Sequence, residues 1–253
     1  MALQVHQFPC LNDNYGFLIR DEGSGKTGCV DTPDADAILA ELKRLGWGLD
    51  VILNTHWHPD HAGGNAAIKA ATGCQIVGPQ EVTRIAPLDR PVGDGDEVRL
   101  GETSLRVLDT GGHTLGHIAY VDAADHIAFV GDTLFALGCG RLFEGTAEQM
   151  WSSLSKLAAL PDQTLVYCAH EYTASNARFA LSVDQSAELK SRAEAVFAAR
   201  ERGEPTVPTT IGQEKAANPF LRAPLLKAGL GLSSASDAQA FAAVRQAKDA
   251  FRG

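Results

Sequence analysis

The chain has 253 residues, 45% of them hydrophobic and 21% charged, which is enough to bury one sizeable core with a small companion. Its formal net charge of −9 argues against the broad positive field that binding to nucleic-acid phosphates requires. No apolar run approaches the roughly 18 residues of a membrane helix, and the N-terminus lacks the basic and apolar blocks of a secretory signal.

Short β-rich runs alternate with glycine-rich turns over the first two-thirds of the chain. Alternating and β-branched patterns predict strands at 3–8, 15–20, 27–31, 51–54, 75–77, 97–100, 104–108, 117–121, 127–130 and 165–168. Apolar residues at helical spacing predict helices at 34–46, which ends at Gly46, and at 147–160, which Pro161 ends. This mixture predicts a layered α/β domain with sheets inside and helices outside.

The pattern changes after residue 172. Helices are expected at 174–183 and 187–201, and a Pro/Thr-rich connector at 205–210 leads towards a last helix at 237–251. No strand pattern occurs in this part of the chain. We therefore expect two domains, a layered one at 1–172 and a small helical one at 173–253.

Five cysteines are scattered along the chain, and none forms a Cys-x-x-Cys pair. An odd, dispersed set is typical of reduced thiols in a reducing compartment, not of a disulfide framework. We therefore expect a cytoplasmic protein in which most of these cysteines are small buried apolar residues.

The clearest chemical signal is a His-x-His-x-Asp-His run at residues 56–61, directly after the apolar run 51–53. In extended backbone His56 and His58 project from one face, and Pro59 disfavours a helix before it. Four ligand-type side chains within six positions can all bind metal only if they serve more than one ion, and imidazole with carboxylate suits zinc, iron or manganese. A surface loop that is His-rich by chance is the alternative, with an expectation well under about 0.01 per sequence.

Three further candidate ligands each follow a predicted strand: His113 in a glycine-rich turn, Asp132 after 127–130, and His170 after 165–168. Taken singly, an aspartate after a strand is more often a turn former, and a lone histidine is more often a satisfied core or surface group. Together with the first cluster, one carboxylate and two imidazoles at strand ends complete a second set of ligands.

These elements, in this order and at these separations, resemble the metallo-β-lactamase superfamily. Within it, the chain is similar to the glyoxalase II (hydroxyacylglutathione hydrolase) family in the segments 55–65, 131–135, 138–141, 143–146, 169–173, 204–208 and 218–222. The resemblance covers nearly the whole chain. It implies an αββα sandwich of layered sheets and helices, followed by a C-terminal all-helical domain that binds substrate.

The resemblance also implies an activity, the hydrolysis of S-D-lactoylglutathione to D-lactate and glutathione in methylglyoxal detoxification. It implies a small glutathione thioester as substrate and two divalent metal ions, zinc first, with iron or manganese also compatible. We expect a monomer, although the sequence leaves the oligomeric state open. The catalytic carboxylates would be Asp60, as a ligand in preference to a general base, and Asp132, which would bridge both ions. The ligands implied are His56, His58 and His113 for one ion, Asp60, His61 and His170 for the other, and Asp132 for both.

Substrate contacts are implied for residues near the C-terminus and beside the metal motifs. Arg245 and Lys248 are three apart and share a helix face, which from spacing alone fits a solvated basic face equally well. The resemblance implies that they bind the glycine carboxylate of glutathione. It implies further substrate contacts from Arg141, Phe143, His170 and Tyr172.

Three positions depart from the family pattern. Arg141 and Phe143 stand where relatives commonly carry lysine and tyrosine, so the charge is kept while a phenol hydroxyl, and a hydrogen bond worth about 0.5–1.5 kcal/mol, is lost. Gly111 stands where a proline is usual, which loosens the turn before His113. None of these changes touches the metal ligands.

Several other functions compete with this hypothesis. A glutathione persulfide dioxygenase on the same fold would use a single iron and leave the second ligand set idle. An RNase Z-like nuclease is disfavoured by the negative charge, and a β-lactam hydrolase by the glutathione-type tail. A non-enzymatic metal-storage protein is the alternative from a different class, and converging ligands with an open water position argue against it.

Overall fold

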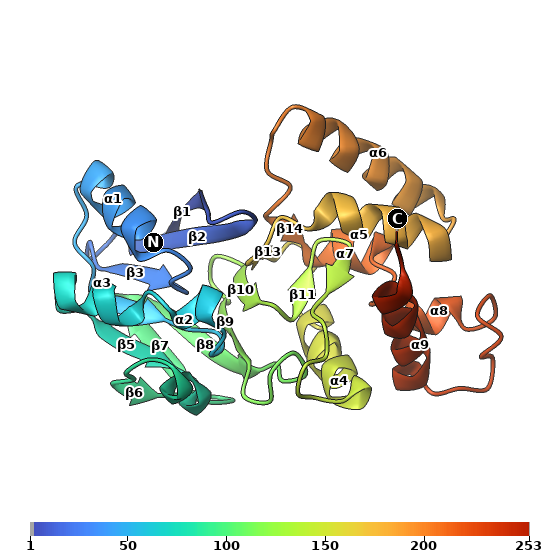
Figure 1. The fold of residues 1–253 in the computed structure, drawn as a ribbon, viewed down its shortest axis with the longest axis horizontal. Helices are drawn as coiled ribbons and strands as arrows, with labels where there is room; N and C mark the ends of the chain where they lie inside the picture. The colour runs from blue at the N-terminus through green and yellow to red at the C-terminus, as the bar shows by residue number, and fades with distance from the viewer. Residues whose placement is uncertain (1–2, 253) are drawn as a thin grey trace. The chain divides into compact units, whose positions relative to one another are not determined.

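The computed structural model describes residues 3–252, which divide into two compact units (Figure 1). Unit 1 comprises the described residues up to Asp109 together with Gly116–Gly131. Unit 2 comprises Thr110–Leu115 and the described residues from Asp132 onward. The compact units divide the chain at points other than the predicted boundary between residues 172 and 173. They do not test that boundary, which stays a prediction.

Unit 1 contains two sheets. The first has six strands in chain order: β1 (Leu3–Cys10), β2 (Asn14–Asp21), β3 (Thr27–Val30), β4 (Val51–Leu53), β5 (Gln75–Gly78) and β6 (Arg90–Pro91). The pairs from β1 to β3 are antiparallel, and those from β3 to β6 are parallel. The other strands of this unit form an antiparallel series: β7 (Glu97–Leu100), β8 (Thr103–Asp109), β9 (Ile118–Asp122) and β10 (Ile127–Gly131).

The helical elements of unit 1 are α1 (Ala35–Leu45), α2 (Pro59–Ala62), α3 (Asn65–Thr72) and the 3₁₀ helix η1 (Gln80–Arg84). Helix α1 begins where the Asp34 carboxylate accepts the backbone N–H of Ala37, and it ends at Gly46 in the left-handed conformation, φ 68°. These capping groups are the signals from which the sequence predicts this helix.

The six-stranded sheet is covered on both faces. On one face, Ile38 of α1 and Ile68 of α3 belong to a buried cluster with Leu18, Ile52 and other apolar side chains of β1–β5. On the other face, Phe17 of β2 lies 5.7 Å, ring centroid to ring centroid, from Phe129 of β10. Burying such a side chain contributes about 1.5–3 kcal/mol, so the layers are held mainly by apolar contact. The layered arrangement of helices and sheets is the one that the sequence predicts.

Unit 2 is mostly helical. Its strands are β11 (Leu134–Phe135), β12 (Gly138–Cys139), β13 (Leu165–Cys168) and β14 (Thr209–Thr210). Its helices are α4 (Ala147–Ala158), α5 (Thr173–Val183), α6 (Ala187–Glu201), α7 (Ile211–Ala217), α8 (Ala223–Leu226) and α9 (Asp237–Ala250). Apolar residues of α5, α6 and α7 pack around Leu137, and Phe220 lies between Phe179 of α5 and Phe241 of α9.

Each predicted strand and helix is present, with ends shifted by no more than two residues, which is the usual spread in assigning element ends. The prediction that no strand follows residue 172 is wrong, since β14 pairs with β13. A strand of two residues is too short to produce an alternating pattern. The strands β6, β11 and β12, the helices α2, α3, α7 and α8 and the 3₁₀ helix η1 are additional to the prediction. They are short, which leaves few turns in which an apolar face can repeat.

Two predictions from composition can also be compared with the structure. All five cysteines are buried free thiols, as the scattered pattern predicts. Within residues 3–252, no helix is long and apolar enough to span a membrane.

Candidate metal centre

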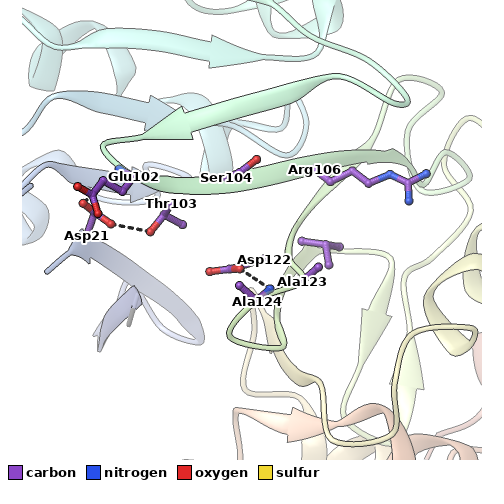
Figure 2. Close-up of a pocket in the computed structure, with 9 residues that line it drawn as sticks. Asp21, Glu102, Thr103, Ser104, Arg106, Asp122, Ala123 and Ala124 are labelled. Carbon is purple, nitrogen blue, oxygen red and sulfur yellow. Dashed lines mark hydrogen bonds between the residues drawn. The ribbon is translucent and has the colours of Figure 1, made fainter. Parts of the chain in front are cut away.

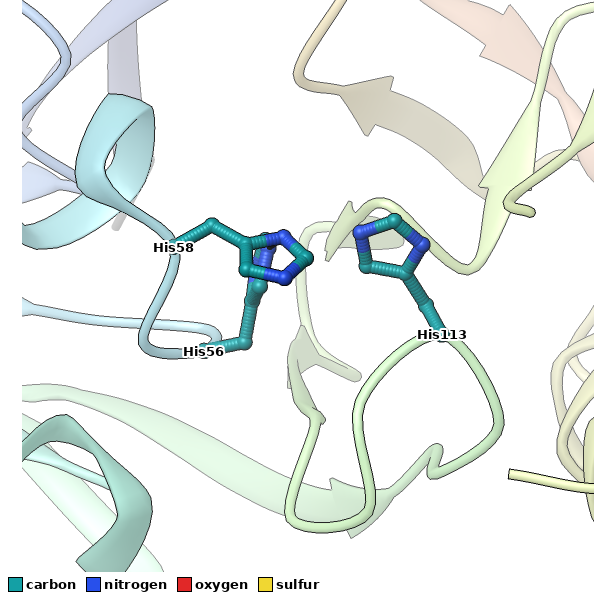
Figure 3. A group of neighbouring side chains, drawn as sticks. All are labelled: His56, His58 and His113. Carbon is teal, nitrogen blue, oxygen red and sulfur yellow. Dashed lines mark hydrogen bonds between the residues drawn. The ribbon is translucent and has the colours of Figure 1, made fainter. Parts of the chain in front are cut away.

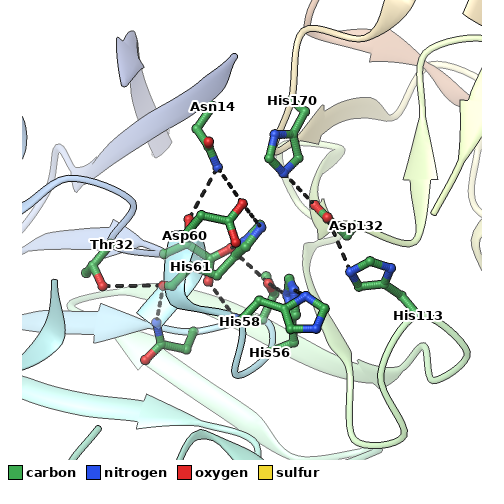
Figure 4. Close-up of polar contacts among 12 residues, drawn as sticks. Asn14, Thr32, His56, His58, Asp60, His61, His113, Asp132 and His170 are labelled. Atoms are coloured by element: carbon green, nitrogen blue, oxygen red, sulfur yellow. Dashed lines mark hydrogen bonds and ion pairs between the residues drawn. The ribbon is translucent and has the colours of Figure 1, made fainter. Parts of the chain in front are cut away.

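Four predicted ligands of unit 1 lie on the segment that follows β4. His56 and His58 are on the loop itself, and Asp60 and His61 are on α2 (Figures 3 and 4). The Nε2 atom of His56 lies 3.0 Å from Nδ1 of His58, and Nε2 of His61 lies 3.5 Å from Oδ2 of Asp60. The donor atoms therefore form two close pairs within residues 56–61.

The Asp31 carboxylate fixes which nitrogen of His61 carries the proton. Nδ1 of His61 donates to Oδ2 of Asp31 at 2.8 Å, so Nε2 is left with its lone pair. The hydroxyl of Thr55 also donates to Asp31, at 2.8 Å, and its oxygen lies 3.0 Å from Nδ1 of His56. Because the Thr55 proton goes to Asp31, its oxygen accepts from His56, and Nε2 of His56 also presents a lone pair.

Asp31 lies in the left-handed region, with φ 57°, which is unusual for a residue other than glycine. Its side chain accepts from the backbone N–H of Thr55 at 2.7 Å as well as from His61 and the Thr55 hydroxyl. Because three donors hold this carboxylate, they fix the backbone in a conformation that aspartate tolerates better than most residues.

Two groups that contact the candidate ligands were not predicted from the sequence: Asp31, and Asn14, whose amide donates to Oδ2 of Asp60 at 3.2 Å. Asp31 follows the apolar strand β3 in the same way that Asp132 follows β10, so its position after a strand was an available signal. Asn14 lies at the start of β2, and nothing in its local sequence points to a metal ligand.

The three remaining predicted ligands lie in unit 2. Nε2 of His113 is 3.4 Å from Oδ2 of Asp132, and Nε2 of His170 is 3.3 Å from Oδ1 of the same carboxylate (Figure 4). Nδ1 of His113 donates to the backbone carbonyl of Arg141 at 2.8 Å, so Nε2 of His113 presents its lone pair. Asp132 therefore directs one oxygen to each of two imidazoles.

The turn that carries His113 (Figure 3) requires a glycine beside it. Gly112 has φ 143°, and a Cβ placed there would lie 2.8 Å from Cβ of Met150 in α4. Only glycine therefore allows the backbone before His113 to approach α4 so closely. The departure at Gly111 leaves this requirement unchanged.

The donor set fits divalent metal ions. Ligands about 2.0–2.1 Å from one tetrahedral ion lie about 3.3 Å from one another. The four donor pairs are 3.0, 3.5, 3.4 and 3.3 Å apart, and they combine imidazole lone pairs with carboxylate oxygens. All seven predicted ligands belong to His/Asp groups that could hold a metal ion.

A cavity of about 350 Å³ lies within unit 2 beside His113 and Asp132. Five of the predicted substrate contacts line it: Arg141, Phe143, Tyr172, Arg245 and Lys248. The sixth, His170, stacks its ring on Tyr172, with centroids 4.7 Å apart and planes 3° apart. The structure therefore brings residues from distant parts of the sequence to one cavity that borders the ligands of unit 2.

The three basic groups of this cavity differ in exposure: Arg141 is exposed, Lys248 is half-buried and Arg245 is buried. Arg245 is 6% exposed, and its Nη1 donates to the carbonyl of Cys139 at 3.0 Å. Nη2 of Arg245 donates to Oδ1 of Asp249 at 2.9 Å, and Nε of Arg141 lies 3.6 Å from the same oxygen. Burial, together with the charge of Arg245, lowers the pKa of Lys248 to about 8. The cavity therefore offers a set of cations suited to a carboxylate.

A second cavity, of about 400 Å³, lies within unit 1 between Asp21 and Asp122 (Figure 2). Both carboxylates are used in folding, because Asp21 accepts from the hydroxyls of Ser24 and Thr103, and Asp122 caps the backbone N–H of Ala124. The hydrogen bond from Ser24 holds the pKa of Asp21 well below its usual range. These partners account for the two aspartates of this cavity without a ligand.

Comparison with known families extends this description. Residues 27–170 match the family model of the metallo-beta-lactamase superfamily, and residues 171–251 match the model described as hydroxyacylglutathione hydrolase C-terminus. The chain is 56% identical over 253 residues to the hydroxyacylglutathione hydrolase of Maricaulis maris, covering 98% of this chain and 99% of the relative. It is 53% identical to that of Erythrobacter litoralis, covering 98% of this chain and all of the relative.

Solved structures show the same fold. ETHE1 from Myxococcus xanthus is similar with a TM-score of 0.66 and 26% identity, covering 99% of each chain. A metallo-beta-lactamase from Staphylococcus aureus has a TM-score of 0.68 and 20% identity, covering 98% of this chain and 71% of that one. The predicted fold class, a layered metallo-β-lactamase domain with a helical C-terminal region, is confirmed.

Replacing Asp31 with asparagine tests the role of its carboxylate. Asparagine tolerates the left-handed backbone, but its amide group cannot accept from three donors. The proton of His61 is then no longer held on Nδ1. We expect the affinity for metal to fall about 10–100-fold, measured by competition with a chelator. Asp122→Asn is the matched control, since Asp122 is also buried in unit 1 but caps a turn. An unchanged metal affinity in Asp31→Asn would contradict the assignment.

Proposed function

Because the chain belongs to the hydroxyacylglutathione hydrolase family of the metallo-β-lactamase superfamily, we propose that it hydrolyses S-D-lactoylglutathione to D-lactate and glutathione. One observation carries the proposal: within unit 2, the Asp132 carboxylate faces two imidazoles at the edge of a cavity lined by cations. A bridging carboxylate suits hydrolysis, and the cations suit a thioester whose thiol part carries carboxylates.

We further propose that the ligands of both units serve a common pair of ions, with zinc as the first choice. His56, His58 and His113 would hold one ion, Asp60, His61 and His170 the other, and Asp132 both. The family, the donor chemistry and the spacing of the donor pairs support this proposal. Bound divalent ions would supply a nucleophile by lowering the pKa of water, and would polarise the acyl oxygen.

The residues of this chain then bind and orient the substrate. Arg245 and Lys248 would hold the glycine carboxylate of glutathione, while Arg141, Phe143 and Tyr172 would contact other parts of the glutathione moiety. A thiol of pKa about 8.5 leaves readily as a thiolate, so the reaction does not require a strong general acid. The main demand on the protein is to hold the thioester carbonyl close to Asp132 and its neighbours.

The alternative hydrolytic and redox functions explain less of the structure. A persulfide dioxygenase with a single iron would leave one set of donor pairs without a purpose, although both Asp132 oxygens face histidines. The absence of nucleic-acid binding, a monomeric state and a cytoplasmic location remain predictions from charge, resemblance and cysteine pattern.

Activity before and after chelation tests the proposed function. We expect purified protein to hydrolyse S-D-lactoylglutathione, followed by loss of thioester absorbance, and to lose the activity reversibly when a chelator removes metal. Asp132→Ala and His58→Ala should lose nearly all turnover, because each removes a ligand. Asp162→Asn, at an exposed carboxylate paired with Lys215, is the control and should keep it. Full activity in the chelated protein would overturn the proposal.

Arg245→Ala should mainly raise KM, because it removes binding energy remote from the bond that breaks. A charged hydrogen bond of about 1.5–3 kcal/mol corresponds to a rise of roughly 10–100-fold. Arg252→Ala is the matched control. Arg252 is an arginine that follows α9, but it is exposed and lines no part of the cavity. A large fall in kcat with KM unchanged would contradict the assignment of Arg245.

The lowered pKa of Lys248 predicts a pH dependence of binding. Its ammonium is present below about pH 8 and is lost above it, so the KM for an anionic thioester should rise as pH passes through 8. Lys248→Arg keeps its charge throughout this range and should remove that rise. Steady-state kinetics at several pH values measures both. An equal rise in KM in the wild type and in Lys248→Arg would assign the titration to another group.

A further inference from the structure

The turn between β11 and β12 connects the metal ligand Asp132 with the substrate cavity. This turn, residues 134–139 with both short strands included, begins directly after Thr133. Two of its residues, Phe135 and Cys139, line the cavity. Leu137 at the tip has φ 56°, a left-handed conformation that costs roughly 1–2 kcal/mol for a residue with a side chain. Such a conformation persists only where the surroundings hold it.

Side chains from the helices of unit 2 hold this turn by its backbone. The N–H of Leu137 donates to Oε2 of Glu214 at 2.8 Å. The amide of Asn218 donates to the carbonyls of Phe135 and Gly138, at 3.1 and 2.9 Å. The amide of Asn176 donates to the carbonyl of Ala136 at 3.1 Å. Helices α5 and α7 therefore satisfy the polar groups of a turn that is distant in sequence.

Glu214 is at the centre of these contacts. It is fully buried, and Oε2 accepts from Asn218 at 2.9 Å as well as from Leu137. Its other oxygen accepts from Thr209 at 2.6 Å and from Arg192. Both oxygens are thus occupied, which fixes the plane of the carboxylate and, through it, the orientation of the Asn218 amide.

The turn also constrains two residues that line the cavity, Asp132 and Arg245. After β12 the chain returns against Asp132, so closely that a Cβ on Gly140 would lie 1.9 Å from the Asp132 carbonyl oxygen. The carbonyl of Cys139 accepts from Nη1 of Arg245 at 3.0 Å. A displaced turn would therefore move the backbone of the bridging carboxylate and release the buried guanidinium.

We propose that Glu214 is a positioning residue for the reaction: by holding the turn at Leu137 and orienting Asn218, it sets the placement of Asp132. This inference rests on the proposed function. It gives the helical C-terminal region a second role beside the binding of carboxylate by Arg245 and Lys248. Glu214 itself touches no substrate, and it acts through the turn.

Glu214→Gln is the direct test, because it keeps shape and volume while one oxygen becomes a donor that faces other donors. We expect kcat to fall about 10–100-fold, since a misplacement of about 1 Å at the reacting centre costs that much. KM should rise only a few-fold, in contrast to Arg245→Ala. Hydrogen exchange should show faster exchange of the Leu137 amide in the folded variant.

Two further variants separate positioning from stability. Arg192→Met removes the ion pair of Glu214 but leaves its contacts with Leu137 and Asn218, so we expect a lower melting temperature and a much smaller fall in kcat than in Glu214→Gln. Lys215→Met changes the neighbouring residue of α7, whose side chain is exposed and pairs with Asp162, and should change neither. If Glu214→Gln keeps kcat within about twofold, or if Arg192→Met loses as much kcat, the proposal is overturned.

The proposal remains testable if Glu214→Gln does not fold, or if the wild type lacks the proposed activity. Should Glu214→Gln not fold, Asn218→Ala carries the same expectation, because it removes both donors to Phe135 and Gly138. Should the wild type not hydrolyse S-D-lactoylglutathione, the proposed function fails by itself. Positioning is then read from metal affinity and Leu137 amide exchange, and unchanged values in the folded variant would overturn it.

Discussion

The candidate centre depends on hydrogen bonds that decide which nitrogen of each imidazole carries a proton. A histidine offers a lone pair to a metal from one nitrogen only if the other keeps its hydrogen. Here the Asp31 carboxylate, the Thr55 hydroxyl and the Arg141 carbonyl hold the Nδ1 protons of His61, His56 and His113. Without these three acceptors, nothing would fix the tautomer or the ring orientation of these imidazoles, and their lone pairs would not be directed towards a metal ion.

The fold supplies these acceptors at strand ends. Asp31 follows β3, and Thr55 and His56 follow β4, its parallel neighbour, so the acceptor and the ligands emerge at one edge of the sheet. The main-chain carbonyl of His61 is held in the same place by the backbone N–H of Thr32 at 2.7 Å and by the Asn54 amide at 2.9 Å. The ligand loop is therefore fixed through its backbone as well as its side chains, as a site with small tolerances requires.

The strands, the long helices and the candidate ligands were predictable because each leaves a local signal. Apolar periodicity marks the elements, and His56, Asp132 and His170 follow apolar runs that end abruptly. Asn14 and Glu214 leave no such signal, because their importance lies in which distant side chain or turn they contact. Asp31 does follow an apolar strand, but the three hydrogen bonds that its carboxylate accepts are seen only in the folded chain. Glu214 in particular reads as one more charged helix residue, yet it is fully buried and bonded to a turn far back in the chain. Only the tertiary structure reveals such partners.

Residue 141 contributes to the candidate site through both its backbone and its side chain. Its carbonyl holds the Nδ1 proton of His113, and any amino acid can supply that group. Its side chain lines the cavity, with the guanidinium 5.9 Å from the ring of Phe143 and Nε 3.6 Å from Asp249. The side chain at this position can thus alter the lining of the cavity while the hydrogen bond to His113 is kept. The backbone, and not the side chain, supplies the acceptor on which the orientation of the His113 ring depends.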